Sequence, residues 1–162
     1  MLVLGIDPGW NNFAYALVKK EGENFILKHW CTLKLTKFKI EQKKLGILYS
    51  ALTEVIRKEK PDLIVIESVL PRANPDSALK LGYTQAIVLL LSELFSIPAE
   101  FIHPTEVKKI IAGNGKAGKS DLKQIFLNLM GSIIRKEAET EADSHKIDAF
   151  FIAMSYLLKN QE

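Results

Sequence analysis

Apolar residues in the N-terminal third of the chain occur in short runs separated by turn signals. Leu2 to Asp7 is an apolar run that ends at a Pro-Gly turn, which predicts a buried strand. Phe13 to Lys19 and Phe25 to Leu33 predict two more strands, joined by a polar turn over residues 21–24. This third of the chain is therefore expected to form a three-stranded antiparallel meander.

After the meander, the apolar residues take up a helical period. They recur at helical spacing from Glu41 until Pro61 ends the segment, which predicts an amphipathic helix. The apolar run from Leu63 to Glu67 predicts a strand parallel to the first one, because a helical crossover separates the two. Asp7 and Glu67 are therefore expected to meet at neighbouring strand ends.

The next predicted helix is apolar on almost every side. Asn74 and Pro75 are typical of a helix N-cap and first turn, and the helix is expected to run to about Phe95, before Pro98. A helix with so little polar surface needs cover on both sides. One side is expected to pack on the sheet, and the other is either buried in the core or covered by a second subunit in a homodimer.

The last third predicts one strand and three helices. The strand covers Ala99 to Ile102, and the helices cover residues 105–111, 121–130 and 144 onward, with Thr105 and Ser120 as caps of the first two. The core stripe of the last helix consists of Ile147, Phe150, Phe151, Met154 and Leu158. The elements together predict one α/β domain over residues 1–162, with a mixed five-stranded sheet flanked by helices.

Composition is consistent with a single domain outside the membrane. Of the 162 residues, 48% are apolar and 25% charged, which supports one substantial core and argues against long disorder. The longest apolar run, Ala86 to Leu91, is too short to cross a bilayer. A strand that begins directly after Met1 leads us to expect a cytoplasmic protein without a signal peptide. Cys31 is the only cysteine, which excludes an internal disulfide.

The charge of the chain is small but unevenly distributed. A net charge of +3 does not by itself indicate nucleic-acid binding. Basic residues concentrate in residues 34–44 and 108–123, whereas acidic residues gather in 137–143, so we expect one basic face. The glycines of residues 113–118 do not follow an apolar strand and lack the spacing of a nucleotide-binding loop, which excludes that function.

Two strand-ending acids and two residues of the last helix form the candidate site. A charge left unpaired at the edge of a core costs roughly 3 kcal/mol or more, so Asp7 and Glu67 are expected to face a ligand. His145 and Asp148 are three residues apart in a helix and share one face. Hard divalent cations take carboxylate and phosphate oxygens as ligands. The four residues therefore predict a divalent-metal site for phosphodiester hydrolysis.

In a two-metal mechanism one cation activates a water and the other stabilises the leaving oxygen, with the ions ~4 Å apart. Asp7 is the best candidate for the shared carboxylate, while Glu67 and Asp148 each favour one ion. His145 completes the coordination shell of a cation or positions a water. Because neutral imidazole prefers manganese to magnesium, His145 predicts stronger activity with Mn²⁺.

Each candidate ligand also has a structural interpretation when it is taken alone. Asp7 is equally compatible with a turn residue, and Asp148 with helix N-terminal electrostatics. His145 alone is more often a cap-region or surface histidine than a ligand. Asp143 is an alternative ligand or a helix cap. The convergence of three separate segments is what favours the metal site.

The same residues fall within a series of motifs. These are Gly5-Ile6-Asp7-Pro8-Gly9, Ile66-Glu67, the segment from Asn74 to Gly82, Val107-Lys108, Gly118-Lys119-Ser120 and His145 to Ala149. In this combination and order, over nearly the whole chain, they resemble the RuvC family of Holliday junction resolvases. The resemblance implies a ribonuclease H-like fold and a homodimer that makes symmetric, paired nicks in a four-way DNA junction. It also implies two divalent cations per site, Mg²⁺ or Mn²⁺, and a branch-migration helicase as a candidate partner.

Matched by position, the resemblance implies that Asp7, Glu67 and Asp148 are the catalytic acids. His145 falls at the fourth ligand, where the family commonly has Asp.

Several basic residues are candidate DNA contacts. Lys108 and Lys119 match family lysines that hold the scissile strand. Lys116, like Lys123, is equally compatible with a phosphate contact and with a solvated lysine. Lys80 and Arg72 flank the start of the long helix and are expected to contact the junction backbone. Pairing with Asp76 or Glu67 is the alternative for Arg72. Binding through these residues predicts an affinity that falls steeply with salt.

Two positions depart from the family pattern. Trp10 replaces a small polar residue, and its ring either stacks on an unpaired junction base or packs beside the strand end. Leu70 stands where the family often has an aromatic wedge, and an apolar side chain there still has the means to unstack a base step.

Two other functions stay open: a related nuclease that acts on structured RNA or flap DNA, and a junction-binding protein that does not cut. The intact acidic set disfavours the pure binder.

Overall fold

The computed structural model describes residues 1–68, 74–136 and 141–160. Its centre is a six-stranded mixed sheet with the strand order β5-β4-β1-β2-β3-β6. The strands are β1 (Leu2–Pro8), β2 (Asn12–Glu21), β3 (Asn24–Lys34), β4 (Leu63–Glu67), β5 (Ala99–Ile102) and β6 (Ile134–Lys136). The helices are α1 (Glu41–Glu59), α2 (Pro75–Leu94), α3 (Pro104–Ala112), α4 (Lys119–Leu129) and α5 (Ser144–Lys159).

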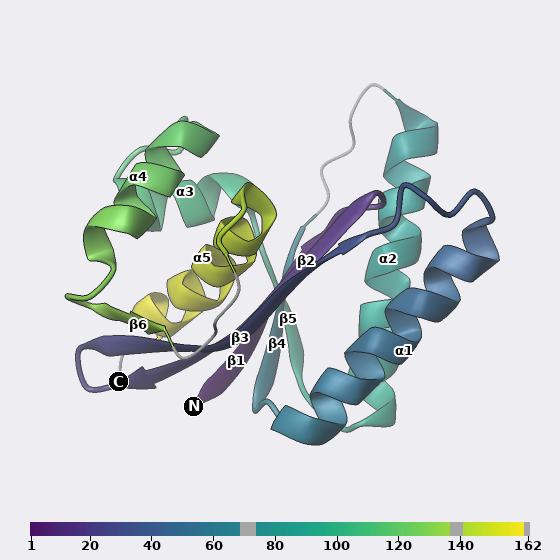
Figure 1. Cartoon of the computed structure of the whole chain (residues 1–162), viewed down its shortest axis with the longest axis horizontal. Helices are drawn as coiled ribbons and strands as arrows, with labels where there is room; N and C mark the ends of the chain where they lie inside the picture. Colours follow the sequence, from purple (N-terminus) through teal and green to yellow (C-terminus); the bar gives the residue numbers. More distant parts are fainter. Residues whose placement is uncertain (69–73, 137–140, 161–162) are drawn as a thin grey trace.

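The helices form two layers around the sheet. Helices α1 and α2 cover one face, and α3, α4 and α5 cover the other (Figure 1). Along β1 the side chains alternate between the layers, because Leu4 and Ile6 pack toward α1 and α2 whereas Val3 packs toward α5. The central strands are thus buried on both faces, which is why they are apolar without alternation in the sequence.

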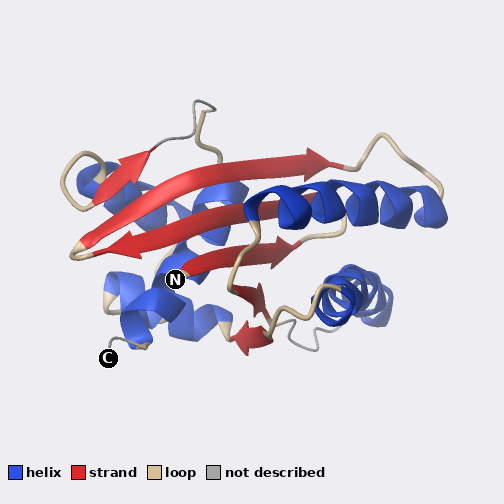
Figure 2. Cartoon of the chain, turned by 90° about the horizontal axis from the view of Figure 1, so that it is seen from below, coloured by secondary structure: helices blue, strands red, loops and turns tan. Residues whose placement is uncertain are grey.

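The predicted meander and the parallel central pair are confirmed. Strands β1, β2 and β3 pair antiparallel (Figure 2). Strand β4 pairs parallel with β1 in the register that sets Ile6 opposite Ile66. The predicted count of five strands is wrong, because the three residues of β6 add a parallel edge beside β3. A strand of three residues is too short to produce a recognisable alternation.

The caps of two helices differ from the prediction. His103, not Thr105, caps α3, and its Nδ1 accepts a hydrogen bond from the backbone N–H of Thr105 at 3.3 Å. Gly118, not Ser120, is the N-cap of α4. In both helices the chain turns helical earlier than the hydroxyl residue, so that residue lies inside the first turn.

Helix α5 approaches the sheet closely at one point. Gly5 in β1 lies under it, and a Cβ atom there would be 2.8 Å from the backbone nitrogen of Ala153 and would collide with the carbonyl oxygen of Ala149. Because only glycine leaves room for the helix backbone, α5 rests directly on β1. Its first turns therefore reach the end of the strand that carries Asp7.

The long helix α2 is buried on one side only. Thr84, Val88 and Leu91 face the protein interior. The opposite side carries four leucines that are 42–59% exposed, namely Leu79, Leu89, Leu90 and Leu94. Complete burial of this helix within the core is thus wrong for the single chain. No helix in the described ranges combines the length and hydropathy needed to cross a membrane.

Candidate active site

The two strand-ending acids and the first turns of α5 meet at one edge of the sheet. Asp7 and Glu67 lie at the carboxyl ends of the parallel neighbours β1 and β4. His145 and Asp148 project from the start of α5 toward them, and all four side chains line one cavity of about 270 Å³. The local pattern of strand end, turn and helix start therefore produces the predicted convergence.

Three of the four residues form a compact set of potential metal ligands. One ligand atom from each of Asp7, His145 and Asp148 lies within 4.8 Å of the other two. The His145 ring nitrogen Nδ1 is 3.2 Å from Oδ2 of Asp7. Glu67 lines the same cavity from β4 but lies outside this set. Oxygen-rich groups with one imidazole suit a divalent cation such as Mg²⁺ or Mn²⁺, so the donor set fits the predicted metal.

Asp148 and His145 both have pKa values above their ordinary range in this cavity. Burial, followed by repulsion from Asp7, raises the pKa of Asp148 from 3.8 to about 6. The hydrogen bond to Asp7 raises the pKa of His145 above its ordinary value. A bound cation lowers the energy of closely spaced carboxylates, so the two shifts describe a site that favours positive charge.

Lysines form one side of the cavity. Lys108 on α3 and Lys119 at the first turn of α4 line it together with the acids. Both lysines lower the pKa of Asp148 and thereby oppose the effects of burial and Asp7. Lys116 is exposed in the loop before α4 and is not among the residues that line this cavity. Two of the predicted DNA contacts are thus next to the candidate ligands.

The remaining predicted contacts are placed elsewhere. Lys80 pairs with Asp76 at 2.7 Å and lies beside the turn that follows β1. Trp10 in that turn packs beneath the Nζ atom of Lys44, 4.7 Å from the ring centroid, and beside the ring of Tyr83. Trp10 thus packs against residues of α1 and α2, while stacking on a base stays a prediction. Leu70 and Arg72 fall outside the described residues.

Asp143 is a helix cap rather than a member of the ligand set. Its Oδ1 accepts hydrogen bonds from the backbone N–H of Lys146 at 2.9 Å and from the hydroxyl of Thr32 at 3.0 Å. These bonds tie the carboxylate to its own helix and to β3, and Asp143 is not part of the three-residue set of Asp7, His145 and Asp148. The cap alternative from the sequence is confirmed.

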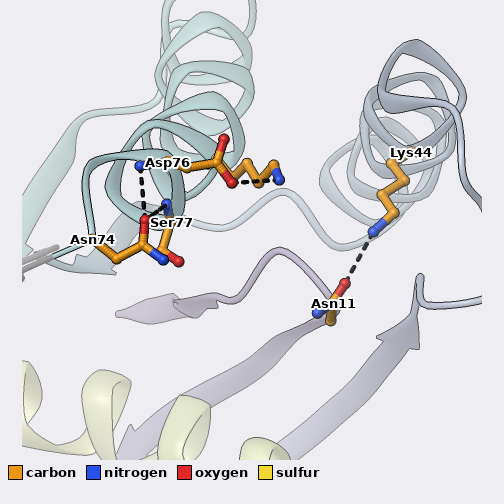
Figure 3. A network of polar contacts seen from close by, with 6 residues as sticks. Asn11, Lys44, Asn74, Asp76 and Ser77 are labelled. Atoms are coloured by element: carbon orange, nitrogen blue, oxygen red, sulfur yellow. Dashed lines mark hydrogen bonds and ion pairs between the residues drawn. The ribbon is translucent and has the colours of Figure 1, made fainter.

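Sequence reasoning missed several residues that support the site. Asn12 lines the cavity at the start of β2. Lys44 of α1 donates a hydrogen bond to Oδ1 of Asn11 at 3.0 Å, which ties the turn after β1 to the helix layer (Figure 3). Thr84 and Gln85 of α2 bond to the strand ends themselves. The only signal of these last two was a pair of polar residues within a helix that is otherwise largely apolar.

Comparison with known proteins agrees with this architecture. The family model described as "Crossover junction endodeoxyribonuclease RuvC" matches residues 3–156. The RuvC endonuclease of Carboxydothermus hydrogenoformans is 31% identical over 159 residues, which cover 98% of this chain and 100% of the relative.

Two solved structures share the fold. The Thermus thermophilus RuvC structure is similar with a TM-score of 0.81 at 25% identity, covering 97% of this chain and 93% of that one. The T. thermophilus RuvC in complex with a Holliday junction substrate is similar with a TM-score of 0.84 at 24% identity, covering 98% and 94%. The predicted ribonuclease H-like α/β fold is confirmed. Because the family model spans nearly the whole chain, the chain belongs to the RuvC family of crossover junction endodeoxyribonucleases.

Proposed function

We propose that this protein cuts four-way DNA junctions by metal-dependent hydrolysis in the cavity between β1, β4 and α5. The observation that carries the proposal is the meeting of Asp7, Glu67, His145 and Asp148 in one cavity with two lysines on its wall. Acids that hold cations and lysines that attract phosphate are both needed for phosphodiester hydrolysis. A protein that only binds DNA gains nothing from carboxylates beside the backbone.

The four candidate ligands have different roles in the site. Asp7 is the shared ligand, because it lies within the set formed with His145 and Asp148 and on the strand next to that of Glu67. His145 is oriented by its contact with Asp7, so its other ring nitrogen remains for a cation or for water. When bound, divalent cations supply an activated water and stabilise the leaving oxygen.

The basic residues hold the substrate. Lys108 and Lys119 contact the phosphates of the strand to be cut, since they line the cavity that contains the acids. Lys116, which is exposed in the loop before α4, contacts phosphates farther from the cut. Such contacts fix the position of the DNA without reading its sequence. A branch-migration helicase remains the candidate partner that would deliver the junction.

The protein acts as a homodimer through α2. Four exposed leucines, at positions 79, 89, 90 and 94, recur at helical spacing on the outer side of this helix and form an apolar stripe that a second copy would cover. Gly82 lies within this stripe and has no side chain, so a helix of the partner can approach closely there. Two copies provide two cavities, as paired symmetric nicks require.

A cleavage assay with defined DNA substrates tests the function. We expect the native protein to cut a four-way junction in Mn²⁺ or Mg²⁺, and to cut duplex DNA, flap DNA and structured RNA at least tenfold more slowly, about 1.4 kcal/mol in barrier. Asp7→Asn keeps the shape of the side chain and removes the charge, so this variant should bind the junction and fail to cut it. Native-rate cutting by the variant would refute the mechanism. Preferential cutting of flaps or RNA would favour the related nuclease.

A further inference from the structure

Helix α2 bonds to both of the strand ends that carry candidate acids. The hydroxyl of Thr84, which is 0% exposed, lies 2.6 Å from the backbone oxygen of Pro8, the residue directly after Asp7. The side-chain amide of the next residue, Gln85, donates a hydrogen bond to the backbone oxygen of Glu67 at 3.1 Å. One turn of one helix thus contacts the ends of β1 and β4.

The bond from Thr84 joins segments that are far apart in the sequence. A hydroxyl has one hydrogen to donate, and the oxygen of Thr84 is also 2.8 Å from the carbonyl of Leu81 in its own helix. The shorter distance is to Pro8, whose oxygen is buried beside the turn. A buried carbonyl without a donor is unfavourable, so loss of the hydroxyl would favour a shift of the strand end.

The turn after β1 has two further supports, one from helix α1 and one from the segment that follows β3. Lys44 donates to the side chain of Asn11, and the backbone N–H of Leu35 donates to the backbone oxygen of Asn11 at 2.8 Å. Figure 3 shows Lys44 extending from α1 toward this turn. The strand end is therefore held from two helices, while the cavity with the acids lies on the other side of it.

We propose that Thr84 and Gln85 are positioning residues that hold the backbone of β1 and β4 so that Asp7 and Glu67 stay at the cavity in which a divalent cation would bind. The proposal rests on the proposed function for its catalytic consequence. The negative charges of the acids in the cavity repel one another. A strand end that pairs with only one neighbouring strand moves more easily than the middle of the sheet. Residues behind metal ligands typically affect metal affinity or activity by 10–100-fold.

Matched variants on α2 separate positioning from general stability. Thr84→Val keeps the shape and removes the donor, whereas Thr84→Ser keeps the donor. Gln85→Met removes the amide at a half-buried position. The control is Ser92→Ala, because the Ser92 hydroxyl donates to the backbone oxygen of Ile97 at 2.6 Å, the same kind of bond at the far end of the helix.

The experiment measures Mn²⁺ binding by calorimetry, junction binding without divalent cation, and cleavage rate against Mn²⁺ concentration. We expect Thr84→Val and Gln85→Met to weaken Mn²⁺ binding roughly tenfold and to raise the Mn²⁺ concentration for half-maximal cleavage, with junction affinity unchanged. Thr84→Ser and Ser92→Ala should behave as the native protein does.

Three results would overturn the proposal. They are native Mn²⁺ affinity in both Thr84→Val and Gln85→Met, a defect in Thr84→Ser equal to that of Thr84→Val, or the same loss in Ser92→Ala. If Thr84→Val fails to fold, Gln85→Met decides. If the native protein binds Mn²⁺ but cuts no junction, the proposed function fails while the Mn²⁺ affinities still test the positioning residues.

Discussion

Replacing Asp148 by Asn is expected to stabilise the metal-free protein while abolishing cleavage. Burial and the charge of Asp7 raise the pKa of Asp148 from 3.8 to about 6. Each pKa unit corresponds to about 1.4 kcal/mol, so ionising this carboxyl costs the folded state about 3 kcal/mol at neutral pH. The uncharged Asn side chain avoids this cost, and it also loses a ligand for the cation.

The direction of the pKa shift of Asp148 determines how the stabilisation by Asp148→Asn changes with pH. Below about pH 3, Asp148 is protonated in both the folded and the unfolded chain, so its ionisation has no effect on stability. Between about pH 4 and pH 6 the unfolded chain releases its proton first, and the folded state loses stability as the pH rises. Above about pH 6 the full cost is present in the native protein and absent from Asp148→Asn.

Denaturant unfolding in EDTA at pH 4 and pH 7.5 measures this difference. At pH 7.5 Asp148→Asn should be more stable by up to about 3 kcal/mol, or roughly 6–12 °C in Tm for a chain of this size. The gain should shrink to about 0.5 kcal/mol at pH 4. Glu23→Gln, at an exposed turn, is the control substitution. Equal stability of Asp148→Asn and the native protein at pH 7.5 would refute the inferred cost of ionising Asp148. A gain in stability that persists unchanged at pH 4 would refute it as well.

Four further predictions concern packing, substrate, assembly and metal. Gly5→Ala should destabilise the protein by about 1–3 kcal/mol in denaturant unfolding and slow cleavage, because the new methyl group collides with α5. Lys119→Ala should slow cleavage and lower the slope of log affinity against log salt by about 1, measured by fluorescence anisotropy. Leu90→Glu should give a monomer in analytical ultracentrifugation, whereas Leu127→Glu, at an equally exposed leucine of α4, should not. Cleavage should be faster in Mn²⁺ than in Mg²⁺ at matched free concentrations, and His145→Asp should reduce that preference.

The candidate ligands were predictable because their signals are local. Asp7 and Glu67 end apolar runs, and His145 and Asp148 share a helix face, so a few neighbouring residues define each position. The sixth strand was not predictable, because its three residues pair with β3 only once the rest of the sheet exists.

The hydrogen bonds from Thr84 and Gln85 of α2 to the strand ends could not be predicted from the sequence either, for a different physical reason. Thr84 and Pro8 are 76 positions apart, and neither residue type indicates that the two will bond. A hydroxyl in a helix ordinarily has its own helix carbonyl or water as a partner. Only the packing of α2 against the end of β1 directs this one to another element.

The small residues near the site show how backbone contact and chemistry depend on each other. Gly5 precedes Asp7 by two positions on β1, and Ala149 follows Asp148 on α5. The absence of a side chain at Gly5 lets the backbone of α5 rest on the strand at Ala149 and Ala153. A bulkier residue at Gly5 would push the helix outward and separate the carboxylates of Asp7 and Asp148, even though every candidate ligand remained present. The glycine of this motif therefore sets the distance between strand and helix, and the proposed sharing of a cation by Asp7 and Asp148 depends on that distance.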